Sequence, residues 1–198
     1  MGGEQRLPTG QVQSIFSGPR GAGRKEGFDL AQPAHRSLRR IALVGNFVPR
    51  KCGIATFTGD IFDKLREFHP RIQVDVYALD DAADPLAYQD IVGTIDRNDP
   101  ASYAQAARRI NESGVDAVWL QHEYGIFGGS DGDMVSGFVD RIAAPLILTP
   151  HTVLAEPSAR QRTILTHLVD RASRIMVMSG HSRDLLAQVY GAPHDILQ

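Results

Sequence analysis

From residue 38 onward, short apolar runs alternate with stretches whose apolar residues recur at helical spacing. The runs over 41–44, 72–78, 115–120, 145–149 and 174–178 are typical of buried strands, and 91–95 is a weaker one. The stretches 55–68, 99–114, 134–142, 158–172 and 182–191 are typical of amphipathic helices. Strand and helix alternate at the spacing of right-handed crossovers, and the strands are continuous apolar runs. The pattern predicts an α/β fold, namely a doubly wound, mainly parallel, Rossmann-like sheet.

Residues with capping preferences mark the helix ends. Asp99 before Pro100 predicts an N-cap with proline in the first turn, and Gly114 a stop. Ser130 or Asp131 is the expected N-cap of the helix over 134–142. Ser182 is the expected N-cap of the last helix, and Gly191 is expected to end it. Residues 195–198 are expected to begin another strand.

Residues 1–37 have a different composition, because they are rich in glycine, contain three prolines and show no hydrophobic period. Such a segment cannot bury enough apolar surface to offset the entropy of ordering it. We therefore predict a disordered tail over 1–37 and one domain over 38–198.

Overall composition narrows the function classes. Apolar residues make up 42% of the 198 residues, charged residues 22%, and the net charge is −2, so no basic excess indicates nucleic-acid binding. Cys52 is the single cysteine, which excludes an internal disulfide and a multi-thiolate zinc site. It fits a reducing compartment, and the first 30 residues lack the apolar core of a secretory signal, so the expected location is cytoplasmic.

Three of the seven histidines follow predicted strands closely: His122, His151 and His181. Ligands of open parallel sheets bind beyond the carboxyl ends of the strands. A single histidine there is more often structural, since it can cap backbone groups or fill a crevice. The joint position of the three favours a shared cleft. A metal site using His122, Glu123, His151 and His181 is a weaker alternative, because no short-spaced ligand pair accompanies them.

The loop after the first strand is the second signal. Gly53 opens the following helix, where free N–H groups and a partial positive charge favour an anion. The loop lacks the G-x-G-x-x-G fingerprint, which disfavours an NAD-linked dehydrogenase, and no G-x-S-x-G elbow indicates an α/β-hydrolase. Cys52 is interpreted as a bystander rather than a nucleophile. The glycine-rich segment 128–132 has two possible interpretations at this point, a mobile lid or a plain loop.

Four short segments together resemble one family. They are Lys51-Cys-Gly-Ile-Ala-Thr-Phe57, His122-Glu123-Tyr-Gly-Ile-Phe-Gly-Gly129, Thr149-Pro-His-Thr152 and Met176-Val-Met-Ser-Gly-His-Ser182. In order and in placement at strand ends, they resemble the N-terminal half of family-4-type retaining glycosyltransferases of the GT-B fold. The resemblance covers about residues 38–198. In that family, two Rossmann-like domains face each other across a cleft, with the acceptor mainly on the N-terminal one and the nucleotide-sugar donor on the C-terminal one.

The resemblance implies roles for individual residues. His151 is expected to lie against the transferred sugar and to have the largest effect on turnover, through a hydrogen bond rather than as a nucleophile. Gly53 and Ile54 are expected to face the donor phosphates and the acceptor. The expected substrate-binding residues also include His122, Glu123, Tyr124, Gly125, Thr152 and His181. No metal or cofactor is expected, and the nucleotide sugar is a co-substrate.

The chain departs from the family in stopping at Gln198, where the donor domain would follow. The expected partners are a sugar or lipid-linked acceptor and the missing C-terminal domain, with peripheral membrane contact left open and no nucleic acid. Two alternatives remain at this point. One is a non-catalytic module of the same fold that binds a carbohydrate or another acceptor. The other is a different Rossmann-fold enzyme, such as a sugar-nucleotide epimerase.

Overall fold

The computed structural model describes residues 38–198, and the tail predicted over 1–37 lies outside the described residues. It contains one six-stranded sheet in the order β3-β2-β1-β4-β5-β6, and every neighbouring pair is parallel. The strands are β1 (Arg40–Gly45), β2 (Gln73–Asp80), β3 (Gly93–Asp96), β4 (Ala117–His122), β5 (Leu146–Pro150) and β6 (Ala172–Ile175). The predicted doubly wound, Rossmann-like α/β fold is confirmed.

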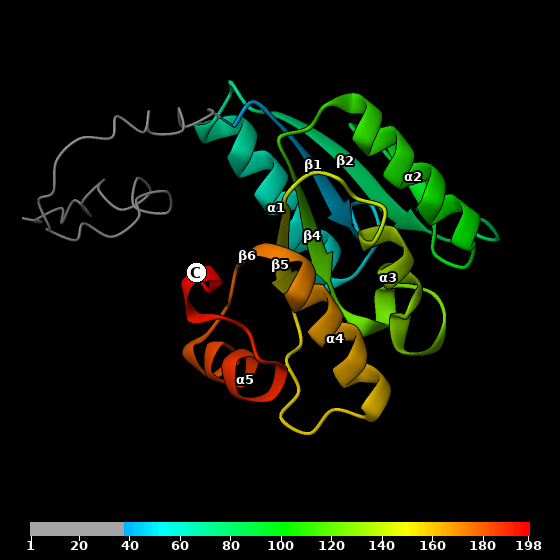
Figure 1. Ribbon diagram of the computed structural model, residues 1–198. Helices are drawn as coiled ribbons and strands as arrows, with labels where there is room; N and C mark the ends of the chain where they lie inside the picture. The colour runs from blue at the N-terminus through cyan, green and yellow to red at the C-terminus, as the bar shows by residue number, and fades with distance from the viewer. Residues whose placement is uncertain (1–37) are drawn as a thin grey trace, which may run out of the picture. The chain divides into compact units, whose positions relative to one another are not determined.

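Five α-helices are found in this part of the chain (Figure 1). They are α1 (Gly53–Phe68), α2 (Pro100–Ser113), α3 (Met134–Val139), α4 (Ala159–Arg171) and α5 (Gly180–Tyr190). Short 3-10 helices cover Tyr124–Ile126, Ser130–Gly132 and His194–Ile196. Along the described residues, no helix is both long enough and apolar enough to cross a membrane.

The two faces of the sheet carry cores of unequal size. Successive strand residues point to opposite faces, so Leu43 and Val44 of β1 belong to different cores. On the Val44 face, α2, α3, α4 and α5 contribute to one large buried cluster. On the Leu43 face, α1 contributes Phe62 to a cluster of only Leu43, Phe47, Phe62, Val76 and Ala78. Most of the burial energy therefore lies on the Val44 face.

The small core has a topological cause. Residues 81–92 join β2 to β3 without any helix, although a parallel crossover usually contains one. The connection runs beside α1, and a groove of about 370 Å³ lies between them. Phe47, Val48 and Phe62 form part of its lining, together with Asp63 and Asp90. This groove contains none of the strand-end histidines.

Several helix ends agree with the sequence and others do not. Asp99 caps α2 through its side chain, and Gly114 and Gly191 end α2 and α5 in the left-handed conformation, as predicted. The expected caps Ser130, Asp131 and Ser182 are wrong. Asp133 precedes α3 and makes no side-chain cap bond.

The cap of α5 is Ser179, whose hydroxyl accepts from the backbone N–H of Ser182 at 3.0 Å. The strand predicted over 174–178 ends at Ile175. The predicted further strand at 195–198 is reduced to a single parallel bridge between Ile175 and Leu197.

Candidate functional site

The carboxyl ends of β1, β4 and β5 lie next to one another at the centre of the sheet. The chain steps outward from β1 to β2 and β3, and then returns to place β4 on the other side of β1. This reversal is the switch point where open α/β sheets bind ligands. Gln121 pairs in register with Thr149, and His122 with Pro150, so the segments that follow β4 and β5 start side by side.

His151 is held from three sides. Its backbone N–H donates to the carbonyl of His122 at 2.8 Å, and its ring Nε2 lies 3.0 Å from Oε1 of Gln121. The ring of Phe57, from the second turn of α1, meets the imidazole edge-on at 5.0 Å between centroids. Burial lowers the pKa of His151, and the nearby carboxylate of Glu123 only partly opposes this shift. Burial of the ring thus favours the neutral imidazole over the charged one.

Gln121 is the residue that sequence reasoning missed. Its side chain is fully buried, although it carries an amide, and its Nε2 has no hydrogen-bond partner among residues 38–198. Gly45 on the neighbouring strand makes room for it, because a Cβ at Gly45 would lie 2.8 Å from Cβ of Gln121. The signal was its place at the end of an apolar strand, directly before His122.

The surface formed by the carboxyl ends of β1, β4 and β5 and the loops that follow them is called the rim here. His122 lies beneath this rim rather than on it. Its side chain is 0% exposed, stacks on Phe127 at 5.8 Å and meets Tyr124 edge-on at 5.0 Å. Burial, with a smaller contribution from the charge of His151, lowers its pKa to about 3. Neither ring nitrogen has a hydrogen-bond partner within the described part of the chain. His122 therefore packs beneath the loop that follows β4, and its role in lining the acceptor side stays a prediction.

Glu123 and Thr152 connect the two loops that follow β4 and β5. One carboxylate oxygen of Glu123 accepts from the backbone N–H of Tyr124 at 2.9 Å, and the other accepts from the hydroxyl of Thr152. Both residues are half-buried beside His151. They therefore hold the His151 loop against the end of β4.

Tyr124 and Gly125 are part of the same packed loop. Tyr124 is buried, its hydroxyl donates to the carbonyl of Gln161 at 3.3 Å, and burial raises its pKa well above the ordinary value. Gly125 is exposed, and its carbonyl accepts from Arg97 at 2.7 Å. Tyr124 thus supports the loop, and Gly125 remains accessible on its surface.

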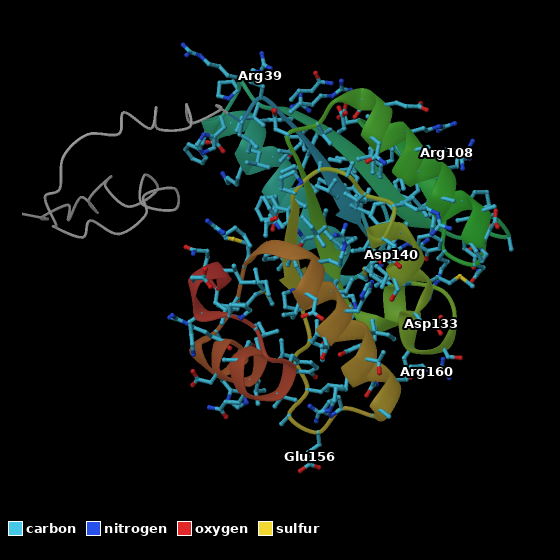
Figure 2. All side chains as sticks on the ribbon, in the orientation of Figure 1. Arg39, Arg108, Asp133, Asp140, Glu156 and Arg160 are labelled. Carbon is cyan, nitrogen blue, oxygen red and sulfur yellow. The ribbon has the colours of Figure 1, made fainter. Side chains whose placement is uncertain are left out.

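The glycine run 128–132 has tight packing, which favours the plain-loop interpretation over a lid. Tyr103 donates to the carbonyl of Arg97 and accepts from the backbone N–H of Gly128. A Cβ at Gly128 would lie 1.8 Å from that same carbonyl oxygen. Further along, Asp133 forms an ion pair with Arg160 at 3.0 Å, and Figure 2 shows these two residues close together between the loop and α4.

The N-terminus of α1 lies on the other side of His151. The thiol of Cys52 caps this helix by accepting from the backbone N–H of Ala55 at 3.4 Å, and it also accepts from the amide of Asn46 at 3.3 Å. Gly53 is exposed, with no atom within 4 Å of the position of a Cβ. Ile54 is half-buried against the large core. Gly53 therefore presents an open helix terminus near the rim.

His181 is not brought into this group. It lies exposed in the first turn of α5, beyond β6, and none of the ring contacts and hydrogen bonds that hold His151 includes it. Within the described residues, no three His, Cys, Asp or Glu side chains are arranged to hold a metal ion. The structure thus gathers Gln121, His151, Glu123 and Thr152 around the switch point, with Phe57 and the start of α1 beside them.

Comparison with known proteins supports this architecture. No protein-family model matches the chain. Curated protein sequences give no match. Among solved structures, an alpha-glucosyltransferase in complex with UDP and a 13-mer DNA containing an HMU base superposes with a TM-score of 0.54 at 14% identity. That match covers 78% of this chain and 40% of the other.

A complex of alpha-glucosyltransferase with UDP and a 13-mer DNA containing a central A:G mismatch gives a TM-score of 0.52 at 15% identity. It covers 71% of this chain and 37% of the other. The chain has a glycosyltransferase-like fold. The likeness is one of fold, and this chain spans less than half the length of either structure.

Proposed function

We propose that the chain forms one wall of the cleft of a GT-B glycosyltransferase of the family-4 type, and that it binds a sugar-containing ligand at His151. The observation that carries this proposal is the position of His151, which is fixed at the switch point by Gln121 and Phe57. The structural neighbours are glucosyltransferases bound to UDP, which supports a nucleotide sugar as the donor.

The acceptor is proposed to be a sugar or a lipid-linked sugar. Although the neighbours also hold DNA, this chain has a net charge of −2. Nucleic-acid binding usually requires an excess of basic residues. In this proposal, Gly53 presents the open start of α1 to an anionic part of the ligand, and Thr152 and Glu123 keep the His151 loop in place.

Within the described residues, the rim favours binding over complete catalysis. Both carboxylate oxygens of Glu123 accept internal hydrogen bonds, and Nε2 of His151 is engaged by Gln121. The Glu123 carboxylate is therefore occupied by contacts within the chain, and His151 is the group of this cluster that is left to meet a ligand. We propose that the donor-binding groups belong to a second domain, and that without them the chain acts as an acceptor-binding module.

The test is ligand titration of the isotope-labelled full chain, followed by NMR. The probes are UDP-glucose, methyl glucoside and a 13-mer DNA duplex. We expect methyl glucoside to shift the signals of Gly53, His151 and Thr152, and the His151→Ala variant to lose this response. UDP-glucose should bind no more tightly than methyl glucoside, because the donor-binding groups are proposed to lie in a second domain. His69→Ala is the matched control, since His69 is exposed directly after the end of α1, at the opposite edge of the sheet.

Shifts confined to the groove lined by Phe47 and Phe62, or a response to DNA alone, would contradict the proposal. Binding of UDP-glucose with hydrolysis or transfer by the chain alone would instead favour the epimerase-like or complete-enzyme alternatives. Addition of EDTA is expected to change none of the sugar responses, because no metal is proposed.

A further inference from the structure

The polar contact between Gln121 and His151 determines more than the position of the ring. A carbonyl oxygen only accepts hydrogen bonds, so Oε1 of Gln121 at 3.0 Å requires a proton on Nε2 of His151. A neutral imidazole carries one proton, and Nδ1 is then the unprotonated nitrogen. The contact thus selects one of the two tautomers.

Gln121 itself has little freedom to move. Its side chain is 0% exposed and lies against Gly45, where a Cβ would approach its own Cβ to 2.8 Å. It stands between β1 and β5, in register with Thr149, whose hydroxyl accepts from Nε1 of Trp119 at 2.9 Å. The amide nitrogen of Gln121, its Nε2, already has no partner within residues 38–198. Losing the contact to His151 would leave the amide oxygen of Gln121 unpaired as well, so that both polar atoms of this buried side chain would lack a partner.

Nδ1 of His151 is the ring nitrogen left for a ligand. It makes no hydrogen bond to any described residue, and it is not among the fully buried nitrogens. The groups that face the ring are the carboxylate of Glu123, the buried imidazole of His122 and the uncharged ring of Phe57. None of these donates a hydrogen bond to Nδ1.

We propose that Gln121 is a positioning residue that keeps His151 as the Nε2–H tautomer, so that Nδ1 faces the cleft as a hydrogen-bond acceptor. The site would then select ligands that present a donor, such as a sugar hydroxyl, rather than a bare oxyanion. This last step rests on the proposed function, whereas the tautomer does not.

The experiment is long-range proton–nitrogen correlation NMR on the imidazoles of the nitrogen-15-labelled full chain, with His151 assigned from the His151→Gln variant. In the wild-type chain at pH 7.5 we expect the proton on Nε2 and an unprotonated Nδ1. A proton on Nδ1 would overturn the proposal, because the Gln121 amide would then be donating to the ring. This measurement needs no variant of Gln121 and no ligand.

Two substitutions extend the test. Gln121→Met keeps the length of the side chain and removes the acceptor, and we expect the share of the Nδ1–H tautomer to rise above its level in the wild type. Gln121→Glu places a carboxylate beside Nε2, and the midpoint of the His151 titration should rise by about 1–3 pH units relative to the wild type. A tautomer and a titration unchanged in both variants would show that Gln121 fills space only.

The outcomes separate this inference from the proposed function. If the wild type shows Nε2–H but no sugar probe binds, the positioning role of Gln121 stands and the proposed function fails. If sugar probes bind while Nδ1 carries the proton, the proposed function stands and the role of Gln121 fails.

Discussion

The buried His122 should make the stability of the chain depend on pH. Its pKa is lowered to about 3 from the ordinary 6.5. At pH values between these two, His122 is therefore protonated in the unfolded chain and unprotonated in the folded chain. Stability is complete above pH 6.5 and falls as the pH drops toward 3. At pH 5.0, 1.5 units below 6.5, the loss from this one group is about 2 kcal/mol, at about 1.4 kcal/mol per unit.

Urea denaturation at pH 7.5 and pH 5.0, followed by circular dichroism, measures this loss. His122→Leu has a similar volume, cannot titrate and removes two buried nitrogens that lack partners among the described residues. We expect the free energy of unfolding of the wild type to fall by about 2 kcal/mol more than that of the variant over this interval. Carboxylate ion pairs and His151 contribute in both proteins, so the difference isolates His122.

His69→Gln is the control for loss of a histidine, since the side chain of His69 is exposed in the folded chain. It should retain the wild-type dependence on pH. Equal losses in the wild type and His122→Leu would refute the reasoning, because they would mean that His122 accepts a proton in the folded chain. At pH 7.5, His122→Leu should be as stable as the wild type or more stable.

Three further changes test the packing around the rim by urea denaturation. Gly45→Ala should lower the free energy of unfolding by about 1–3 kcal/mol, because the new Cβ would overlap Gln121. Gly53→Ala, with open space around the new Cβ, should change it by less than about 0.5 kcal/mol. Equal effects of the two substitutions would contradict the close approach of Gly45 to Gln121. Arg50→Ala should lower the free energy of unfolding by about 2 kcal/mol, because the buried Asp80 loses its ion pair at 2.8 Å. In a double-mutant cycle, adding Asp80→Asn should recover part of this loss. Ser158→Ala removes the capping box of α4 and should cost about 1 kcal/mol; an unchanged urea midpoint would show that the cap is not needed.

Hydrophobic periodicity was enough to predict the fold class, because it reports burial directly. Each strand in the structure overlaps an apolar run, and the continuous runs correctly indicated parallel strands covered on both faces. Element ends were less predictable where several candidate caps stand close together. Ser179 and Ser182 are both serines near the start of α5, and the sequence does not say which of them has an extended backbone.

The sequence predicted where the strand-end histidines lie, but not how they pack. His122 and His151 lie at the carboxyl edge of the sheet, since all parallel strands end there. Adjacent strand residues face opposite ways, so Gln121 turns toward His151 while His122 turns toward Phe127 on the other face. Sequence periodicity does not tell which of the two reaches the rim. The cap by Cys52 was also missed, because cysteine is not among the usual N-cap residues.

The connection over residues 81–92, which contains no helix, affects how the molecule fluctuates. The β2–β3 edge rests on the small core around Phe62, and β3 has only four residues. We therefore expect partial opening of that edge to cost less free energy than opening the centre of the sheet, and its amide hydrogens to exchange with solvent before those of β1 and β4. Because Gln121 lies on β4 and His151 directly follows β5, both on the far side of β1, such opening should leave their geometry intact.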